Sequence, residues 1–251
     1  MVKKEGKFKW LEEGKSGRSV ILLHGLMGGV ENFGEMVNFI SAEYKVYGLD
    51  LKLFEGRTLL KVSVKALSDY LHAFMNHLGL ESAVLIGNSM GGHIGLIFTK
   101  DYPEKVDGLI LTGSSGLFEE SMGSSFPRRG DKNYIRTKTE EVFYDPKVAT
   151  DELVDKVFEI ANNRISVLKL IGYAKSAIRH NMANDIPKIT KPTCLIWGAE
   201  DKVTPPHVAQ EFNKLLPNSE LHWIPLCGHA PMWEHPKRFS EIALKFLKTR
   251  F

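Results

Sequence analysis

Short apolar runs alternate with amphipathic stretches along the first two-thirds of the chain. Such runs are typical of parallel strands that are buried on both faces and joined by crossover helices. The pattern predicts six core strands, at residues 20–23, 44–49, 83–86, 106–111, 193–197 and 220–224. A further, antiparallel strand is expected at the edge of the sheet, at residues 8–11.

Helical periodicity fills the intervals between these strands. It is clearest near the C-terminus, where apolar residues recur with the i, i+3, i+4 spacing of an amphipathic helix. These residues are Phe239, Ile242, Ala243, Phe246 and Leu247. The helix that carries them is expected to pack on the sheet.

The alternation breaks between about Ser114 and Lys191. Residues 116–131 are rich in Gly, Ser and Pro, and residues 151–184 have helical periodicity. Because this segment lies between two strands of one sheet, we interpret it as a helical cap over a site. A helical decoration elsewhere on the surface is the alternative. The expected division is a core of residues 1–114 and 191–251 and a cap of residues 115–190.

Composition narrows the class of protein. The chain has 251 residues, of which 43% are hydrophobic and 25% charged, as expected for one globular domain with an insertion. Its net charge is +3 and its clustered charges alternate in sign, which argues against nucleic acid or an anionic membrane as partner. A small-molecule substrate and a monomeric or homodimeric protein are expected.

Cysteine usage and targeting signals point to the cytoplasm. Cys194 and Cys227 are too few for a disulfide framework, and their spacing matches no metal site. The N-terminal charges precede no apolar signal-peptide core, and no run approaches the length of a membrane span. We therefore expect a cytoplasmic protein without a bound metal.

The strongest chemical signal is a G-x-S-x-G sequence at residues 87–91, between a predicted strand and a predicted helix. A serine there requires a sharp turn, and the flanking glycines let strand and helix approach each other. The turn would present Ser89 Oγ as a nucleophile, and the Met90 N–H would face a developing oxyanion. A glycine-rich turn with an incidental serine, or a phosphate cradle, is the alternative.

A serine nucleophile needs a base and a group that orients the base. His229 and Asp201 each follow a predicted strand, so both are expected at the same sheet edge as Ser89. We assign His229 as the base and Asp201 as the orienting acid. Glu200 and Asp185 are the competing acids.

A glycine-rich turn at residues 24–29 follows the first core strand. Its Leu26 N–H is the expected second donor to the oxyanion, beside Met90. His24 is expected to hold this turn by hydrogen bonds. Met27 is a candidate for lining an apolar substrate pocket, with core packing as the alternative.

These residues resemble the α/β-hydrolase superfamily over nearly the whole chain. The match is specific at residues 24–25, 87–92 and 228–229 and at Asp201. The resemblance implies an α/β fold with a mostly parallel eight-stranded sheet flanked by helices and a cap inserted after the sixth strand. It also implies hydrolysis through a covalent acyl-enzyme, with no cofactor.

Two short segments of the chain are similar to those of the meta-cleavage-product hydrolases, which break C–C bonds in vinylogous diketones. They are the elbow at residues 88–92 and the run 233–235 after the histidine. This resemblance makes Asn88 and Trp233 candidates for substrate contact. Arg164 in the cap is a candidate for holding a substrate carboxylate, with a solvated cap residue as the alternative.

The sequence also departs from that branch. Ala230 stands where those enzymes usually have a tryptophan, and residues 26–27 replace a glycine-rich stretch. The main prediction is therefore a carboxylesterase-like serine hydrolase that cleaves a small carboxylic ester. The alternatives are a C–C bond hydrolase, a perhydrolase that uses peroxide in place of water, and a ligand receptor without catalysis.

Overall fold

The computed structural model describes residues 1–118 and 128–251, in which eight strands form one sheet of order β1-β2-β4-β3-β5-β6-β7-β8. The expected Gly-, Ser- and Pro-rich stretch at 116–131 lies partly outside the described residues. The strands are β1 Val2–Glu5, β2 Phe8–Glu13, β3 Ser19–Leu23, β4 Lys45–Leu49, β5 Ala83–Asn88, β6 Val106–Thr112, β7 Thr193–Gly198 and β8 Ser219–Ile224.

Strand directions agree with the expected fold class. The strands from β3 to β8 pair in parallel, whereas β2 runs antiparallel to β4 and β1 antiparallel to β2. The six predicted core strands and the predicted antiparallel edge strand are all present, with bounds shifted by at most two residues. Strand β1 was not predicted, because all four of its residues are exposed and carry no apolar alternation. The mostly parallel, eight-stranded sheet of an α/β-hydrolase is thus confirmed.

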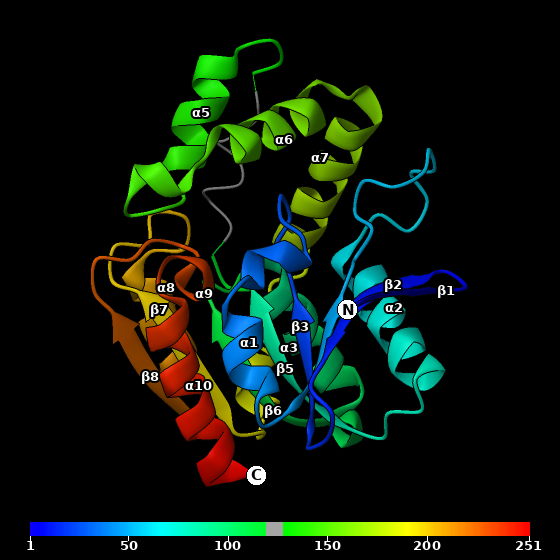
Figure 1. The fold of residues 1–251 in the computed structure, drawn as a ribbon, viewed down its shortest axis with the longest axis vertical. Helices are drawn as coiled ribbons and strands as arrows, with labels where there is room; N and C mark the ends of the chain where they lie inside the picture. The colour runs from blue at the N-terminus through cyan, green and yellow to red at the C-terminus, as the bar shows by residue number, and fades with distance from the viewer. Residues whose placement is uncertain (119–127) are drawn as a thin grey trace.

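Helices cover both faces of the sheet (Figure 1). The helices are α1 Met36–Ser41, α2 Val64–His77, α3 Met90–Asp101, α5 Lys132–Glu140, α6 Asp151–Asn162, α7 Arg164–Arg179, α8 Pro206–Leu215, α9 Pro231–Glu234 and α10 Pro236–Arg250. The short 3-10 helices are η1 Val30–Phe33, η2 Pro103–Lys105, η3 Pro146–Val148 and η4 Ile186–Lys188. Apolar residues of α2, α3 and α8 form one core layer, and those of α1 and α10 form the other.

The segment between β6 and β7 carries α5, α6 and α7, which lie beyond the upper end of the sheet in Figure 1. Polar contacts join these helices to the core. Ser176 Oγ of α7 accepts a hydrogen bond from Val64 N of α2 at 3.1 Å. The buried Lys169 ammonium donates to the carbonyl oxygen of Gly56 at 3.0 Å, and burial lowers the pKa of this lysine. Lys156 of α6 pairs with Glu31 of η1.

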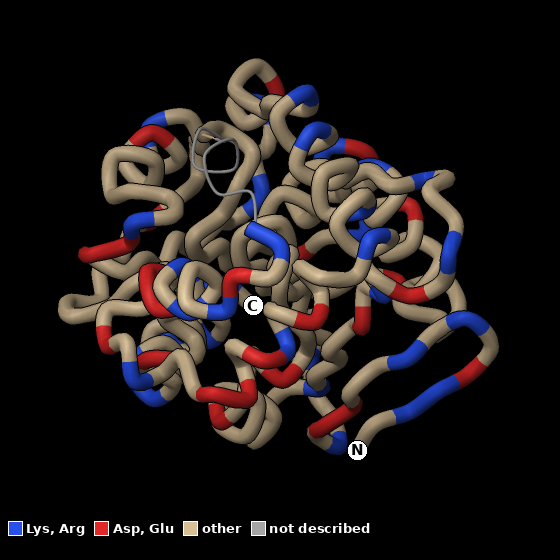
Figure 2. Tube along the Cα trace, turned by 90° about the horizontal axis from the view of Figure 1, so that it is seen from above, with Lys and Arg blue, Asp and Glu red and all other residues tan. Residues whose placement is uncertain are grey.

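Lys and Arg positions are interspersed with Asp and Glu positions along the trace (Figure 2). Many of these charges form surface ion pairs, such as Arg18–Asp107 at 2.7 Å and Lys248–Glu43 at 2.7 Å. None of the helices within residues 1–118 and 128–251 has the length and apolar character that crossing a membrane requires.

Close packing of β3, β5 and α3 sets the position of the turn at Ser89. A Cβ atom on Gly91, at the start of α3, would overlap the carbonyl oxygen of Leu23 at the end of β3. A Cβ atom on Gly87 would lie 2.6 Å from the Cα of Gly92. Both glycines are therefore required by close backbone approach.

Replacing Gly91 by alanine is expected to destabilise the protein by about 3 kcal/mol or more, because the new methyl group meets backbone that cannot rotate away. The matched control is Gly95→Ala on the same helix, where the nearest atom lies 3.7 Å from the new Cβ. There the helix preference of alanine should leave stability unchanged or raise it by about 0.5–1 kcal/mol. Urea denaturation of both variants checks this, and equal stability of the two would contradict it.

Candidate active site

Ser89 lies at the turn between β5 and α3, with φ 55° and ψ −120°. A non-glycine residue with positive φ is strained, and surrounding contacts must hold it. Its N–H donates to Thr112 O at 3.0 Å, and its carbonyl oxygen accepts from Ser115 N at 3.1 Å. The turn is thus fixed by β6 and the segment after it, and the half-buried Ser89 side chain lines a cavity.

His229 and Asp201 form a buried hydrogen-bonded pair. His229 Nδ1 lies 2.9 Å from Asp201 Oδ2, and the two side chains are 8% and 0% exposed. Asp201 Oδ1 accepts hydrogen bonds from Val203 N at 2.8 Å and Thr204 N at 2.9 Å, and Oδ2 accepts from Thr204 Oγ1 at 2.8 Å. Because every acceptor on the carboxylate has a donor, a charged Asp201 is stabilised in a buried site.

The loop that carries His229 is held by three separate elements. His229 N donates to Val142 O at 2.8 Å, and Asn88 Nδ2 donates to His229 O at 3.1 Å. The Glu234 carboxylate accepts from Gly228 N at 2.7 Å and from Tyr144 N at 2.8 Å. Strand β5, helix α9 and the segment after α5 therefore fix the backbone at His229.

Backbone donors are available on both sides of Ser89. In residues 1–118 and 128–251, neither Leu26 N nor Met90 N has a hydrogen-bond acceptor. Leu26 lines the cavity beside Ser89, and Met90 is the first residue of α3, so its N–H belongs to the positive end of that helix. Two free N–H groups beside a serine side chain can stabilise an oxyanion.

His24 holds the turn after β3, as its sequence position predicts. Its Nε2 accepts a hydrogen bond from Leu51 N at 3.1 Å, so its Nδ1 carries the proton and donates to Gly25 O at 2.9 Å. Burial lowers the pKa of His24, in keeping with a neutral ring.

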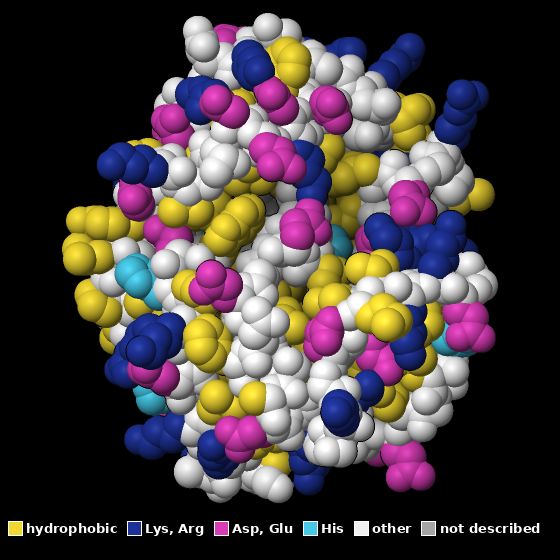
Figure 3. All heavy atoms as spheres, viewed as in Figure 1, with side chains coloured by type: hydrophobic (Ala, Val, Ile, Leu, Met, Phe, Trp, Pro, Cys, Tyr) yellow, Lys and Arg dark blue, Asp and Glu magenta, His cyan; other side chains and the backbone are white. Residues whose placement is uncertain are grey.

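A cavity of about 330 Å³ contains Ser89 and His229. Helices of the segment between β6 and β7 supply much of its wall, through Tyr134, Ile135, Leu153, Val157, Leu170 and Ala174. Hydrophobic side chains gather at the hollow between these helices and the sheet (Figure 3). The cavity thus offers an apolar enclosure to a small substrate.

The structure separates the candidates for substrate contact. Met27, Asn88 and Trp233 line the cavity. Asn88 also uses its amide to hold His229, which makes it a positioning residue as much as a contact. Arg164 is exposed at the first position of α7 and is not among the residues that line the cavity.

Two other cations do line the cavity. Lys138 of α5 donates to Glu141 at 2.6 Å, and this hydrogen bond raises the pKa of the lysine. Lys202 directly follows Asp201, is exposed, and forms no ion pair with any residue in the described part of the chain. Lys202 is therefore the cavity cation whose charge remains available to a ligand.

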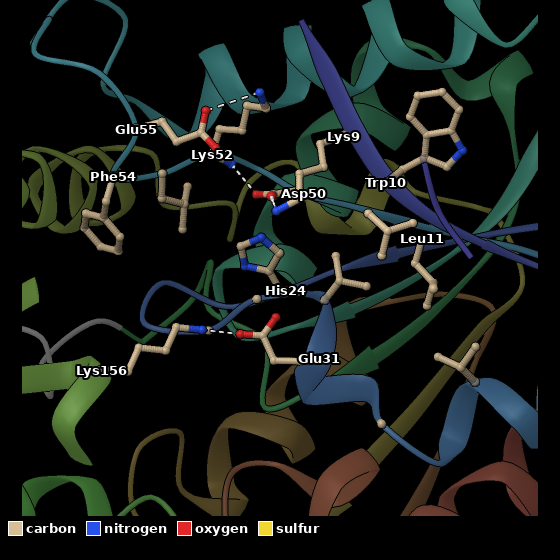
Figure 4. A pocket seen from close by; sticks show the side chains of 17 residues that line it. Lys9, Trp10, Leu11, His24, Glu31, Asp50, Lys52, Phe54, Glu55 and Lys156 are labelled. Carbon is tan, nitrogen blue, oxygen red and sulfur yellow. Dashed lines mark hydrogen bonds and ion pairs between the residues drawn. The ribbon is translucent and has the colours of Figure 1, made fainter. Parts of the chain in front are cut away.

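A second cavity is lined by His24 and several charged side chains (Figure 4). Its volume is about 660 Å³, and it shares Gly28 with the first cavity. Its charged side chains neutralise one another in pairs, with Lys9–Asp50 at 3.1 Å and Lys52–Glu55 at 3.2 Å. Lys156 and Glu31 form the third pair there. Although larger, this cavity is not lined by Ser89 or His229, so the smaller one is the candidate active site.

Sequence reasoning missed the residues that support the pair. Thr204 Oγ1 contacts both Asp201 Oδ2 and His229 Nδ1, the latter at 3.3 Å. A threonine three residues after an aspartate is a turn-forming pattern, and that signal could have identified it. Glu234 lies within the run 233–235 but is distinguished only by its tertiary contacts. Glu200, the competing acid, instead accepts from Cys227 N at 2.9 Å.

Comparison with known proteins shows the family to which the chain belongs. Residues 18–143 and 151–236 match the family described as the alpha/beta hydrolase fold. The 2-hydroxy-6-oxononadienedioate/2-hydroxy-6-oxononatrienedioate hydrolase of Pseudomonas sp is 30% identical over 94% of this chain and 90% of that protein. The 2-hydroxy-6-oxo-6-(2'-aminophenyl)hexa-2,4-dienoic acid hydrolase of Metapseudomonas resinovorans is 32% identical over 96% of this chain and 88% of that protein.

A solved structure is similar along its whole length. MGS-MChE2, an alpha/beta hydrolase enzyme from the metagenome of lagoon sediments at Mar Chica, Morocco, is 42% identical with a TM-score of 0.82. The match covers 100% of this chain and 99% of that one. Fold, motif positions and relatives agree, and the chain belongs to the alpha/beta hydrolase family.

Proposed function

We propose that this hydrolase cleaves a carbon–carbon bond in a 2-hydroxy-6-oxo dienoic acid. The observation that carries the proposal is the likeness, over 94% and 96% of the chain, to two hydrolases named for such acids. The hydrogen-bonded pair of His229 and Asp201, in one site with Ser89, supplies the groups that the reaction needs. These relatives favour carbon–carbon cleavage over the simple ester expected from the sequence.

Ser89 is the proposed nucleophile and His229 the proposed base. Because His229 Nδ1 is bonded to Asp201, Nε2 is the nitrogen left to take a proton from Ser89 Oγ. Asp201 holds the ring in this tautomer and stabilises its cation. When Oγ attacks the ketone carbon, the oxyanion that forms takes hydrogen bonds from the N–H groups of Leu26 and Met90.

Collapse of that adduct breaks the carbon–carbon bond beside the ketone. The step uses the tautomer in which the 2-hydroxyl proton has moved to the carbon beside the ketone, which leaves a 2-oxo acid conjugated with a double bond. The electron pair passes to the departing carbon, where this conjugation spreads the charge, and His229 returns the proton to it. Water, deprotonated by the same ring, then attacks the Ser89 ester; the ring gives that proton to Ser89 Oγ, and the second acid is released. Helices α5, α6 and α7 serve as the cap that encloses these steps and excludes bulk water.

We assign the acid end of the substrate to Lys202. It is the cavity cation without a carboxylate partner among the described residues, whereas Lys138 is engaged by Glu141. Arg164 is exposed and outside the cavity lining. A lysine ammonium binds a carboxylate by a charge-assisted hydrogen bond and needs no bidentate geometry.

A small-ester hydrolase is the second candidate, and the cavity favours it in one respect. Apolar side chains such as Leu153, Val157 and Leu170 make up much of the wall, and Ala230 widens the lining near His229. Such a wall suits an uncharged acyl group. The same nucleophile and base would serve both reactions, so the substrate preference distinguishes them.

The distinguishing measurement compares kcat/KM for one 2-hydroxy-6-oxo dienoate with that for nitrophenyl esters of increasing acyl length. The dienoate is expected to exceed the best ester by at least about 10-fold, equivalent to about 1.4 kcal/mol in transition-state binding. The reverse order would reject carbon–carbon cleavage and support the ester hydrolase.

Ser89→Ala is expected to lower kcat by about 10⁴- to 10⁶-fold, because the covalent step loses its nucleophile. Its thermal unfolding should match that of the parent protein. The matched control is Ser68→Ala, at a buried serine of α2 whose hydroxyl has no hydrogen-bond partner among the described residues. The control should retain full turnover. Full turnover by Ser89→Ala would contradict the assignment.

Lys202→Ala is expected to lower kcat/KM for the dienoate by roughly 10-fold, about 1.4 kcal/mol, through loss of the carboxylate contact. The neutral nitrophenyl ester should be hydrolysed at an unchanged rate. Arg164→Ala is the matched control and should leave both rates unchanged. If Arg164→Ala selectively lost dienoate turnover instead, Arg164 of the cap, and not Lys202, would be the residue that binds the substrate carboxylate.

A further inference from the structure

Three side chains of metal-ligating type meet at the edge of the sheet. Cys194 of β7 pairs in register with Glu220 of β8, and His222 follows two residues later on the same face of β8. The Cys194 Sγ, one Glu220 oxygen and one His222 ring nitrogen lie within 4.8 Å of one another. Cys194 is near the amino end of β7, whereas Ser89, Asp201 and His229 all follow carboxyl ends of strands.

The Cys194 side chain packs in the hydrophobic core, and its thiol is not part of a disulfide. It is fully buried, and Sγ forms no hydrogen bond with the residues in 1–118 and 128–251. Burial, and secondly the Glu220 carboxylate, raise the pKa of the thiol, so it is neutral unless a cation stabilises the thiolate. A thiol that faces a carboxylate and an imidazole has the surroundings that a divalent metal would use.

The donor set selects the metal. Thiolate sulfur and imidazole nitrogen favour zinc or cobalt over magnesium or calcium. Zinc lies about 2.3 Å from sulfur and about 2.0–2.2 Å from nitrogen or oxygen, so tetrahedral ligand atoms are roughly 3.3–3.6 Å apart. His222 Nε2 and Glu220 Oε1 are 2.9 Å apart, and no two of the three ligand atoms are more than 4.8 Å apart. Side-chain movements of about 1 Å would therefore bring them to tetrahedral spacing.

We propose that Cys194, Glu220 and His222 form a zinc site at the edge of the sheet. On binding, a Zn–Sγ bond replaces the S–H bond and the thiol proton passes to solvent, so affinity rises with pH. The Glu220 and His222 side chains are 36% and 34% exposed, so solvent supplies the fourth ligand. The ion would link the edge strand β8 to β7 and stabilise the folded protein without entering the catalytic reaction.

Arg250 is the nearest competing cation. Its Nη2 lies 3.6 Å from Glu220 Oε2, whereas the oxygen nearest to His222 is Oε1. Such an exposed ion pair contributes little to the stability of the protein. Arg250 therefore leaves one carboxylate oxygen for the metal.

The test is a cobalt titration of the full chain after treatment with a chelator. One equivalent of Co²⁺ should produce a thiolate-to-cobalt charge-transfer band in the near ultraviolet, and Zn²⁺ should abolish the band. Zn²⁺ at about 100 times its Kd should also raise Tm by roughly 5 °C. His222→Ala and Cys194→Ser should remove both signals, and Glu220→Gln should weaken the affinity at least 10-fold.

Two matched controls separate this site from the catalytic loop. Cys227→Ser removes the other buried cysteine, and His229→Ala removes the catalytic imidazole; each should keep the cobalt band. If Cys194→Ser unfolds, the half-buried His222→Ala still decides the question. The proposal is overturned if stoichiometric cobalt gives no band, or if the band persists in His222→Ala.

Discussion

The backbone crossing at Ser89 is the constraint on which the rest of the site depends. Strand β5 ends and α3 begins within one residue, and the approach to Leu23 leaves no space for a Cβ atom on Gly91. Ser89 can hold φ 55° here because β6 and the segment after it form hydrogen bonds with its N–H and with its carbonyl oxygen. The same crossing sets the Met90 N–H beside the serine, so the proposed nucleophile and one proposed oxyanion donor are positioned by the same turn.

The proposed base, His229, is held in place by a different principle, the satisfaction of buried polar groups. Asp201 is 3% exposed, and an uncompensated carboxylate at that depth would be costly. Two backbone N–H groups, the Thr204 hydroxyl and the His229 ring all donate to it. Glu234 in turn engages the backbone of Gly228. Preorganised polar contacts of this kind cost no rearrangement during the reaction.

Much of the fold could be predicted because the apolar runs of buried parallel strands are strong local signals. The proposed catalytic residues could be singled out for a related reason: Ser89, Asp201 and His229 each follow such a run. Strand β1 was not accessible, since its four exposed residues are placed by pairing with β2 and not by burial. The supporting roles of Glu234 and Thr204 could not be predicted, because both act through tertiary contacts. The side of the proposed cap on which Arg164 lies could not be predicted either, because it depends on helix packing. The cluster around Cys194 required the register of β7 and β8.

Charge and shape contribute unequally to selectivity at this site. The surface charges largely pair with one another, and the larger cavity beside His24 neutralises its own three cations. Long-range steering of an anionic substrate is therefore weak. What remains near Ser89 is an apolar enclosure of about 330 Å³ with one unpaired ammonium, that of Lys202, among the described residues. A methylene group in an apolar pocket discriminates between two substrates by only about 1–3 kcal/mol. We therefore expect the helices α5, α6 and α7 to set the size of the substrate, and the Lys202 ammonium to set its orientation.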